Sequence, residues 1–79
     1  MIDRLLGKKV IGIKQSSKAI KNGEGICLYV AKDADEKLVL PLIKIAEESG
    51  MPVKYVETMK ILGSMCGIEV KAATALVLE

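Results

Sequence analysis

A continuous apolar run, Ile-Cys-Leu-Tyr-Val-Ala at residues 26–31, limits the fold of this chain more than any other segment. A strand with one solvated face alternates apolar and polar residues, but this run has no charged position. The run is therefore typical of a central strand that is covered on both faces. Shorter apolar runs predict two further strands of the same sheet, over residues 53–56 and 73–78.

Helical patterns separate these strands and predict helices over residues 14–22, 36–49 and 59–65. We also expect a short helical turn over residues 3–6 and a short strand or extended segment over residues 10–13. The spacing of apolar residues predicts which side chains of the helices face the core. These are Ala19 and Ile20 in the first helix, Leu38, Leu42, Ile45 and Ala46 in the second, and Met59, Leu62, Met65 and Cys66 in the third.

Residues that favour helix ends stand at the expected boundaries. Asn22-Gly23 is a common carboxyl-terminal cap, and Thr58 is a common amino-terminal one. Asp33 and Asp35 form a carboxylate pair, for which a metal or acid–base role is the alternative to helix capping. We favour capping because the pair lies between a strand and a helix. Pro41 interrupts the second helix and is expected to kink it or to remove one hydrogen bond.

The alternation of strands and helices predicts an α/β/α three-layer sandwich with a small mixed sheet, folded as a single domain over residues 1–79. The chain is 51% hydrophobic but contains no Phe or Trp, so its core is built from aliphatic residues and Met. Its two rings, Tyr29 and Tyr55, lie inside apolar runs. This placement argues against the RNA-binding modules that stack bases on exposed aromatic side chains.

Charge is distributed unevenly along the chain. Residues 1–22 carry a net charge of +5, whereas residues 23–79 carry −3. Lys14, Lys18 and Lys21 lie at helical spacing and share one face of the first helix. A basic block on an otherwise acidic chain predicts a local anionic partner, and a solvated amino-terminal surface is the alternative.

Several kinds of chemistry lack the residues they need. The chain has no His, and its two cysteines, Cys27 and Cys66, form no CxxC motif, so neither an imidazole base nor a four-ligand zinc site is expected. A phosphate-binding GxxxxGK[ST] loop is also absent. We expect no catalytic residues, no metal and no cofactor. The cysteines are expected to be buried free thiols, with a single disulfide as the alternative. The lack of a signal peptide or a membrane-length apolar run predicts a cytoplasmic protein.

Three separated motifs resemble one known family. The segment 11–23, Ile-Gly-Ile-Lys-Gln-Ser-Ser-Lys-Ala-Ile-Lys-Asn-Gly, resembles the signature helix of the kink-turn-binding proteins called the "L-seven-Ae / L-thirty-e" superfamily. The second motif, Val30-Ala31-Lys32-Asp33-Ala34-Asp35, resembles the strand-to-helix segment of the family. The third resembles its closing loop and comprises Leu62-Gly63 and Cys66-Gly67-Ile68-Glu69-Val70, continued by Ala72-Ala73. Pro41 also falls where many members carry a mid-helix proline. The resemblance covers nearly all of the chain and is closest to the small stand-alone bacterial type.

The resemblance implies a binding site at one end of the sandwich. Residues 12–18 would enter the widened major groove at tandem sheared G·A pairs, and residues 68–70 would cover a nucleotide flipped out of the bend. Lys14 can donate to guanine, and Gln15 can both donate and accept. The candidate RNA-binding residues are Gly12, Ile13, Lys14, Gln15, Lys18, Lys21, Lys32, Ile68, Glu69 and Val70.

The chain departs from the family at one point, because archaeal and eukaryotic members often carry Asn-Glu where it has Lys14-Gln15. An acid that accepts from guanine N–H groups is thereby lost. The alternatives to an RNA-binding role are that Gly12 simply forms a turn and that Ile68 and Val70 pack inward. The expected function is to bind kink-turn RNA, of the ribosome or of a riboswitch, as a monomer, and to stabilise its kinked form. The alternatives are a ribosomal subunit protein and an accessory substrate-binding domain of an RNA-modifying enzyme.

Overall fold

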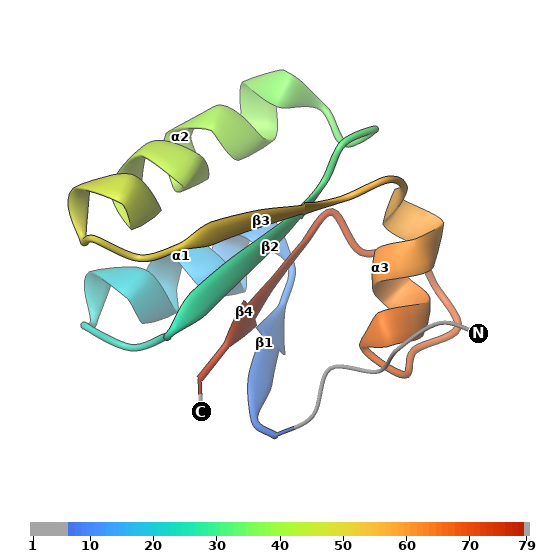
Figure 1. Cartoon of the computed structure of the whole chain (residues 1–79), viewed down its shortest axis with the longest axis horizontal. Coiled ribbons are helices and arrows are strands. Elements are labelled where there is room, and N and C mark those ends of the chain that lie inside the picture. The colour runs from blue at the N-terminus through green and yellow to red at the C-terminus, as the bar shows by residue number, and fades with distance from the viewer. Residues whose placement is uncertain (1–6, 79) are drawn as a thin grey trace.

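The computed structural model describes residues 7–78, which form one sheet with helices on both of its faces (Figure 1). The expected helical turn over residues 3–6 lies outside the described residues. None of the helices within residues 7–78 has the length and apolar character that crossing a membrane requires. The elements are, in order, β1 (Lys9–Ile11), α1 (Ile13–Lys21), β2 (Cys27–Ala31), α2 (Glu36–Glu48), β3 (Val53–Val56), α3 (Met59–Met65) and β4 (Thr74–Val77).

The four strands form a mixed sheet in the order β1-β4-β2-β3. β2 and β3 are parallel, whereas β4 is antiparallel to both β1 and β2. Helices α1 and α2 pack together on one face of the sheet, and α3 packs on the other (Figure 1). The predicted three-layer architecture is confirmed. Because β4 runs opposite to the other strands, β1, β2 and β3 finish at the same end of the sheet at which β4 begins. We call this the carboxyl end of the sheet.

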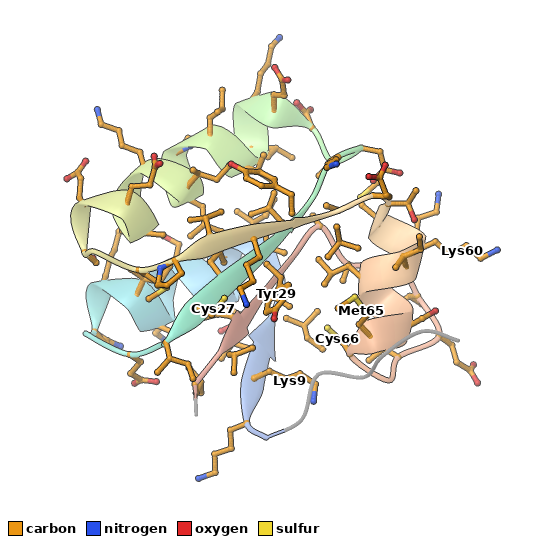
Figure 2. The ribbon with its side chains drawn as sticks, in the orientation of Figure 1. Lys9, Cys27, Tyr29, Lys60, Met65 and Cys66 are labelled. Carbon is orange, nitrogen blue, oxygen red and sulfur yellow. The ribbon has the colours of Figure 1, made fainter. Side chains whose placement is uncertain are left out.

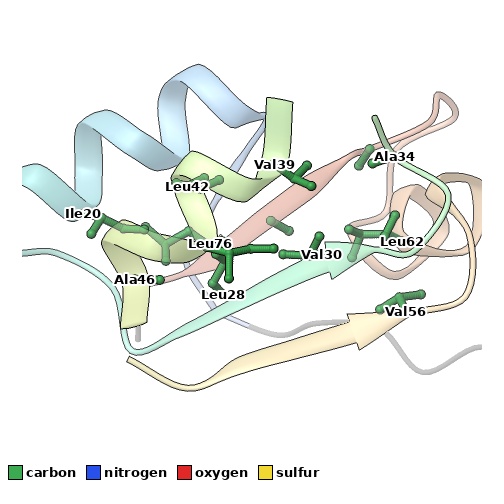
Figure 3. Packing of buried hydrophobic residues seen from close by; sticks show 14 of the residues in the cluster. Ile20, Leu28, Val30, Ala34, Val39, Leu42, Ala46, Val56, Leu62 and Leu76 are labelled. Atoms are coloured by element: carbon green, nitrogen blue, oxygen red, sulfur yellow. The ribbon is translucent and has the colours of Figure 1, made fainter. Parts of the chain in front are cut away.

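The core lies between the sheet and the helices, and aliphatic side chains fill it (Figure 3). Leu28 of β2 and Leu76 of β4 are register partners and are fully buried. Leu42 from α2 belongs to the same buried cluster, while Leu62 from α3 is buried on the opposite face of the sheet (Figure 3). All but the first residue of the apolar run over residues 26–31 therefore lies in β2, an inner strand of a sheet that has helices on both faces (Figure 1).

The acidic pair caps helices, as predicted, but the two carboxylates serve different helices. Asp35 accepts from the backbone N–H of Lys37 at 3.0 Å, at the start of α2. Asp33 accepts from the backbone N–H of Met59 at 2.7 Å, and so satisfies the first residue of α3. Thr58 also caps α3, because its hydroxyl oxygen accepts from the backbone N–H of Ile61. The loop after β2 thereby fixes the start of α3.

The predicted inward face of α2 is wrong at one position. Leu38 is 57% exposed, and the buried residues are Val39, Leu42, Ile43 and Ala46. The apolar residues of α2 extend around more than one face, so that two helical phases fit the sequence. Packing against α1 and the sheet selects the phase that begins at Val39.

Two other apolar positions are more exposed than predicted. Tyr55 is 55% exposed because β3 is the outermost strand and pairs on one side only. Ile26 is 56% exposed because the strand begins one residue later, at Cys27. Tyr29 of β2 is half-buried, and the Lys54 ammonium lies 6.0 Å from the centroid of its ring.

Candidate nucleic-acid interface

The turn between β1 and α1 depends on glycine. Gly12 has φ 104° and ψ 154°, a conformation that is essentially closed to residues with a side chain. A Cβ added to Gly12 would meet no atom of the protein within 4 Å, so the backbone angles alone require glycine here. The backbone N–H of Gly12 donates to the carbonyl oxygen of Thr74 at 3.0 Å. The start of α1 is therefore fixed to the start of β4.

A buried polar contact that the sequence analysis missed holds α1 at the same point. The hydroxyl oxygens of Ser16 and Thr74 lie 3.4 Å apart, and both residues are fully buried. Ser16 shares the inward face of α1 with Ala19 and Ile20, at the i, i+3 and i+4 spacing that could have revealed it. Thr74 thus positions α1 twice, through its carbonyl and through its hydroxyl.

The first turn of α1 presents free N–H groups. An α-helix leaves its first N–H groups without an intrahelical acceptor, which here leaves those of Ile13, Lys14 and Gln15. Gly12 supplies no side-chain cap, and no acidic residue lies in this turn. The helix dipole and the free donors favour an anion at such a terminus.

Lysines continue the positive surface along α1. Lys14, Lys18 and Lys21 are all exposed, and the helix rise places Lys21 about 10 Å beyond Lys14. Gln15 and Lys18 border one shallow hollow of about 220 Å³ beside β1. Lys14 and Gln15 therefore lie in the first turn of α1, near the carboxyl end of the sheet, Lys18 lies about one turn further along, and Lys21 lies at the far end of the helix.

The segment between α3 and β4, which we call the 68–71 loop, is held against α3. The N–H of Ile68 donates to the carbonyl of Gly63 at 3.1 Å, and the N–H of Ala72 donates to that of Met59 at 3.0 Å. A Cβ on Gly63 would overlap the carbonyl oxygen of Val70, so this close approach requires glycine. Gly63 belongs to one of the matching motifs, but its steric role could not be predicted from the sequence.

The apolar residues of the 68–71 loop point in different directions. Ile68 is half-buried and packs against the core, which agrees with the alternative of inward packing for this residue. Val70 is 69% exposed, and Glu69 is exposed as well. The loop therefore offers solvent one large apolar side chain, one carboxylate and the ammonium-bearing side chain of Lys71.

The two parts of the candidate interface lie at the same end of the molecule. Thr74 is the fourth residue after Val70, which limits the distance between their Cα atoms to about 14 Å. Thr74 in turn contacts Gly12. Lys32 directly follows β2 at this end, but its ammonium pairs with the Glu57 carboxylate at 2.8 Å. Both side chains of this pair are exposed, so the pair contributes little to stability and leaves Lys32 able to exchange partners.

Both cysteines are free thiols. Cys27 is half-buried on β2, and Cys66 is buried at the end of α3, where it points toward the sheet with Met65 (Figure 2). Burial raises the pKa of the Cys66 thiol, and the nearby Lys9 ammonium opposes this rise. Within residues 7–78, no group of His, Cys, Asp and Glu side chains is arranged to hold a metal ion.

Comparison with known proteins supplies relatives over nearly the whole chain. Residues 5–79 match the family described as ribosomal protein L7Ae/L30e/S12e/Gadd45. An RNA-binding protein of Caldanaerobacter subterraneus subsp. tengcongensis is 45% identical over 75 residues, covering 95% of this chain and 92% of the relative. The RNA-binding protein YbxF of Geobacillus stearothermophilus is 43% identical over 73 residues, covering 92% and 89%.

A solved structure has the same fold. The 15.5kD RNA binding protein of Giardia lamblia superposes on 90% of this chain with a TM-score of 0.84 and 25% sequence identity. This chain spans 60% of the length of the Giardia protein.

Proposed function

Because this chain belongs to the ribosomal protein L7Ae/L30e/S12e/Gadd45 family, we propose that it binds RNA, and that its preferred RNA is a kink-turn. The relatives named above carry the name RNA-binding protein, which supports the first part. The second part rests on the family resemblance of the motifs and on the geometry at the carboxyl end of the sheet. In this proposal the protein acts as a monomer, without cofactor or catalysis, on an RNA of the ribosome or of a riboswitch.

The observation that carries the proposal is the uncapped start of α1. Gly12 leaves the start of the helix open, and the first turn presents free N–H groups. The exposed side chains of Lys14, Gln15 and Lys18 lie in the first two turns of α1. The N–H groups and Lys18 suit phosphate oxygens, which position a protein without reading sequence. Lys14 and Gln15 suit the guanine and adenine edges of sheared G·A pairs.

Val70 supports the bent state of the RNA. An exposed apolar side chain beside this polar surface can cover an unstacked base, which exists in the kink but not in a straight duplex. Contacts that are made only to the kinked form shift the RNA population toward that form. The protein would therefore stabilise the kink rather than cut or modify the RNA.

Separate substitutions test the two kinds of contact. Lys14→Ala and Gln15→Ala should each cost roughly 1–3 kcal/mol of binding to a kink-turn with intact G·A pairs, and little on an RNA without those pairs. Lys18→Ala should weaken binding to both RNAs alike and reduce the slope of affinity against salt by about one unit. Val70→Asp should weaken binding to the kink-turn, because a carboxylate would replace the apolar contact and face the phosphates.

Lys44→Ala on α2 is a matched control, because Lys44 is exposed on a different helix. Its affinity for the kink-turn should equal that of the parent protein. If Lys14→Ala, Gln15→Ala and Lys44→Ala lose equal affinity on both RNAs, the base contacts proposed at α1 are wrong.

A further inference from the structure

A groove between α3 and the 68–71 loop adjoins the predicted interface and shares Ile68, Glu69 and Val70 with it. It measures about 730 Å³, and its lining residues are Lys60, Ser64, Ile68, Glu69, Val70 and Lys71. Three of these, Lys60, Ser64 and Lys71, have no part in the interface described above. We call this feature the α3 groove.

The two sides of α3 have opposite characters. Met65 and Cys66 point toward the sheet, whereas Lys60 extends away from it (Figure 2). Lys60 and Ser64 are exposed and lie four residues apart, so they share the outer face of the helix. Lys71 is exposed on the loop that forms the opposite wall. The two lysines therefore come from opposite walls of the groove.

The lining suits a nucleotide strand better than an apolar ligand or a lone ion. Val70 and the exposed part of Ile68 provide apolar lining for a ribose or a base, and Lys60 and Lys71 can bind the phosphates on either side of it. The Glu69 carboxylate repels phosphate but accepts a hydrogen bond from a ribose 2′-hydroxyl, a group that DNA lacks. The Ser64 hydroxyl can donate to a phosphate oxygen.

We propose that the α3 groove is a second RNA contact, which binds the sugar–phosphate backbone of the strand that leaves the bend. This inference rests on the proposed kink-turn function. Continuity supports it, because the 68–71 loop forms both the edge of the proposed interface and a wall of the groove. A strand that passes Val70 thus meets Lys60 and Lys71 next. The contact lengthens the footprint of this short domain beyond the bend itself.

The test compares two double variants, Lys60→Gln/Lys71→Gln and the control Lys37→Gln/Lys44→Gln. All four lysines are exposed, so each variant removes the same charge and both are expected to fold. Affinity is measured on a kink-turn with both arms and on one whose outgoing arm is cut back to the bend. Each titration is repeated between about 50 and 200 mM salt.

We expect the groove variant to bind the full kink-turn roughly tenfold or more weakly, with the salt slope reduced by about two units. On the shortened RNA it should match the parent protein, and the control should bind close to the parent on both RNAs. If the parent prefers the kink-turn but the groove and control variants behave alike on both RNAs, the second contact is refuted. The groove would then be a solvated surface or a protein-docking surface. If the parent itself shows no preference for the kink-turn, the proposed function fails together with this inference.

Discussion

Replacing Gly63 with alanine should change the free energy of unfolding through two opposing effects, a gain in helix propensity and a steric overlap with the 68–71 loop. In a helix interior, alanine is favoured over glycine by about 1 kcal/mol, so helix propensity alone predicts a more stable protein. In this structure, however, the added Cβ would overlap the carbonyl oxygen of Val70 and would lie 3.2 Å from its carbonyl carbon. Both of those atoms belong to backbone, so the 68–71 loop must move away from α3.

Overpacking of this kind typically costs about 1–3 kcal/mol. Subtracting the gain in propensity leaves a net loss of roughly 0–2 kcal/mol in the free energy of unfolding. Urea unfolding followed by circular dichroism measures this loss. Displacement of the loop should appear in the backbone amide chemical shifts of residues 68–72. The loss in free energy of binding to kink-turn RNA should exceed the loss in free energy of unfolding, because Val70 moves with the loop.

Ser64→Ala is the matched control, since it is the next residue of α3 and is exposed. It should raise the free energy of unfolding slightly, by about 0.5 kcal/mol or less, and leave the loop in place. A Gly63→Ala protein that is about 1 kcal/mol more stable than the parent, with unchanged amide shifts in the loop, would refute the packing argument.

Three further predictions concern other parts of the chain. Gly12→Ala should lower the free energy of unfolding by about 1–3 kcal/mol through backbone strain, and a loss below about 0.5 kcal/mol would contradict the conformation assigned to Gly12. Thr74→Val should cost about 1 kcal/mol by leaving the Ser16 hydroxyl without its partner, and the double variant with Ser16→Ala should cost less than the sum of the two single changes. Cys66 should react with iodoacetamide more slowly than Cys27 at pH 8, because burial raises its pKa and limits access. Equal alkylation rates for the two thiols would contradict the burial of Cys66. The unfolded chain loses the thiol proton near the ordinary pKa of 9.0, whereas the folded protein keeps it to higher pH. The free energy of unfolding should therefore fall as pH rises above 9.0.

The sequence predicted the layers of the fold because apolar period and strand position are local signals. Both faces of a strand formed by an apolar run need cover, and the structure places residues 27–31 of this run in an inner strand between helices. The family resemblance of the motifs is confirmed as well. What the sequence left open is the phase of α2, since Leu38 and Val39 are both aliphatic. Only the position of α1 and the sheet decides which of the two is buried.

The candidate site likewise has features that local sequence patterns predict and features that they do not. The exposure of Lys14, Gln15 and Lys18 follows from helical spacing, which the sequence contains. The contacts that hold their helix join residues 58 positions apart, Ser16 and Thr74, and no local pattern pairs them. The steric role of Gly63 likewise depends on a loop that returns to α3 several residues later. Long-range contacts of this kind need the folded chain.

The preference of the protein for bent RNA is the central claim, and one titration measures it directly. A kink-turn RNA carries a donor dye on one arm and an acceptor dye on the other, and a straight duplex of equal length is the control. We expect added protein to bring the arms together, seen as increased energy transfer, and to bind the kink-turn at least tenfold more tightly than the duplex at matched salt, which is about 1.4 kcal/mol. Equal affinity for the two RNAs, with no change in energy transfer, would show that α1 and the 68–71 loop form only a general basic surface.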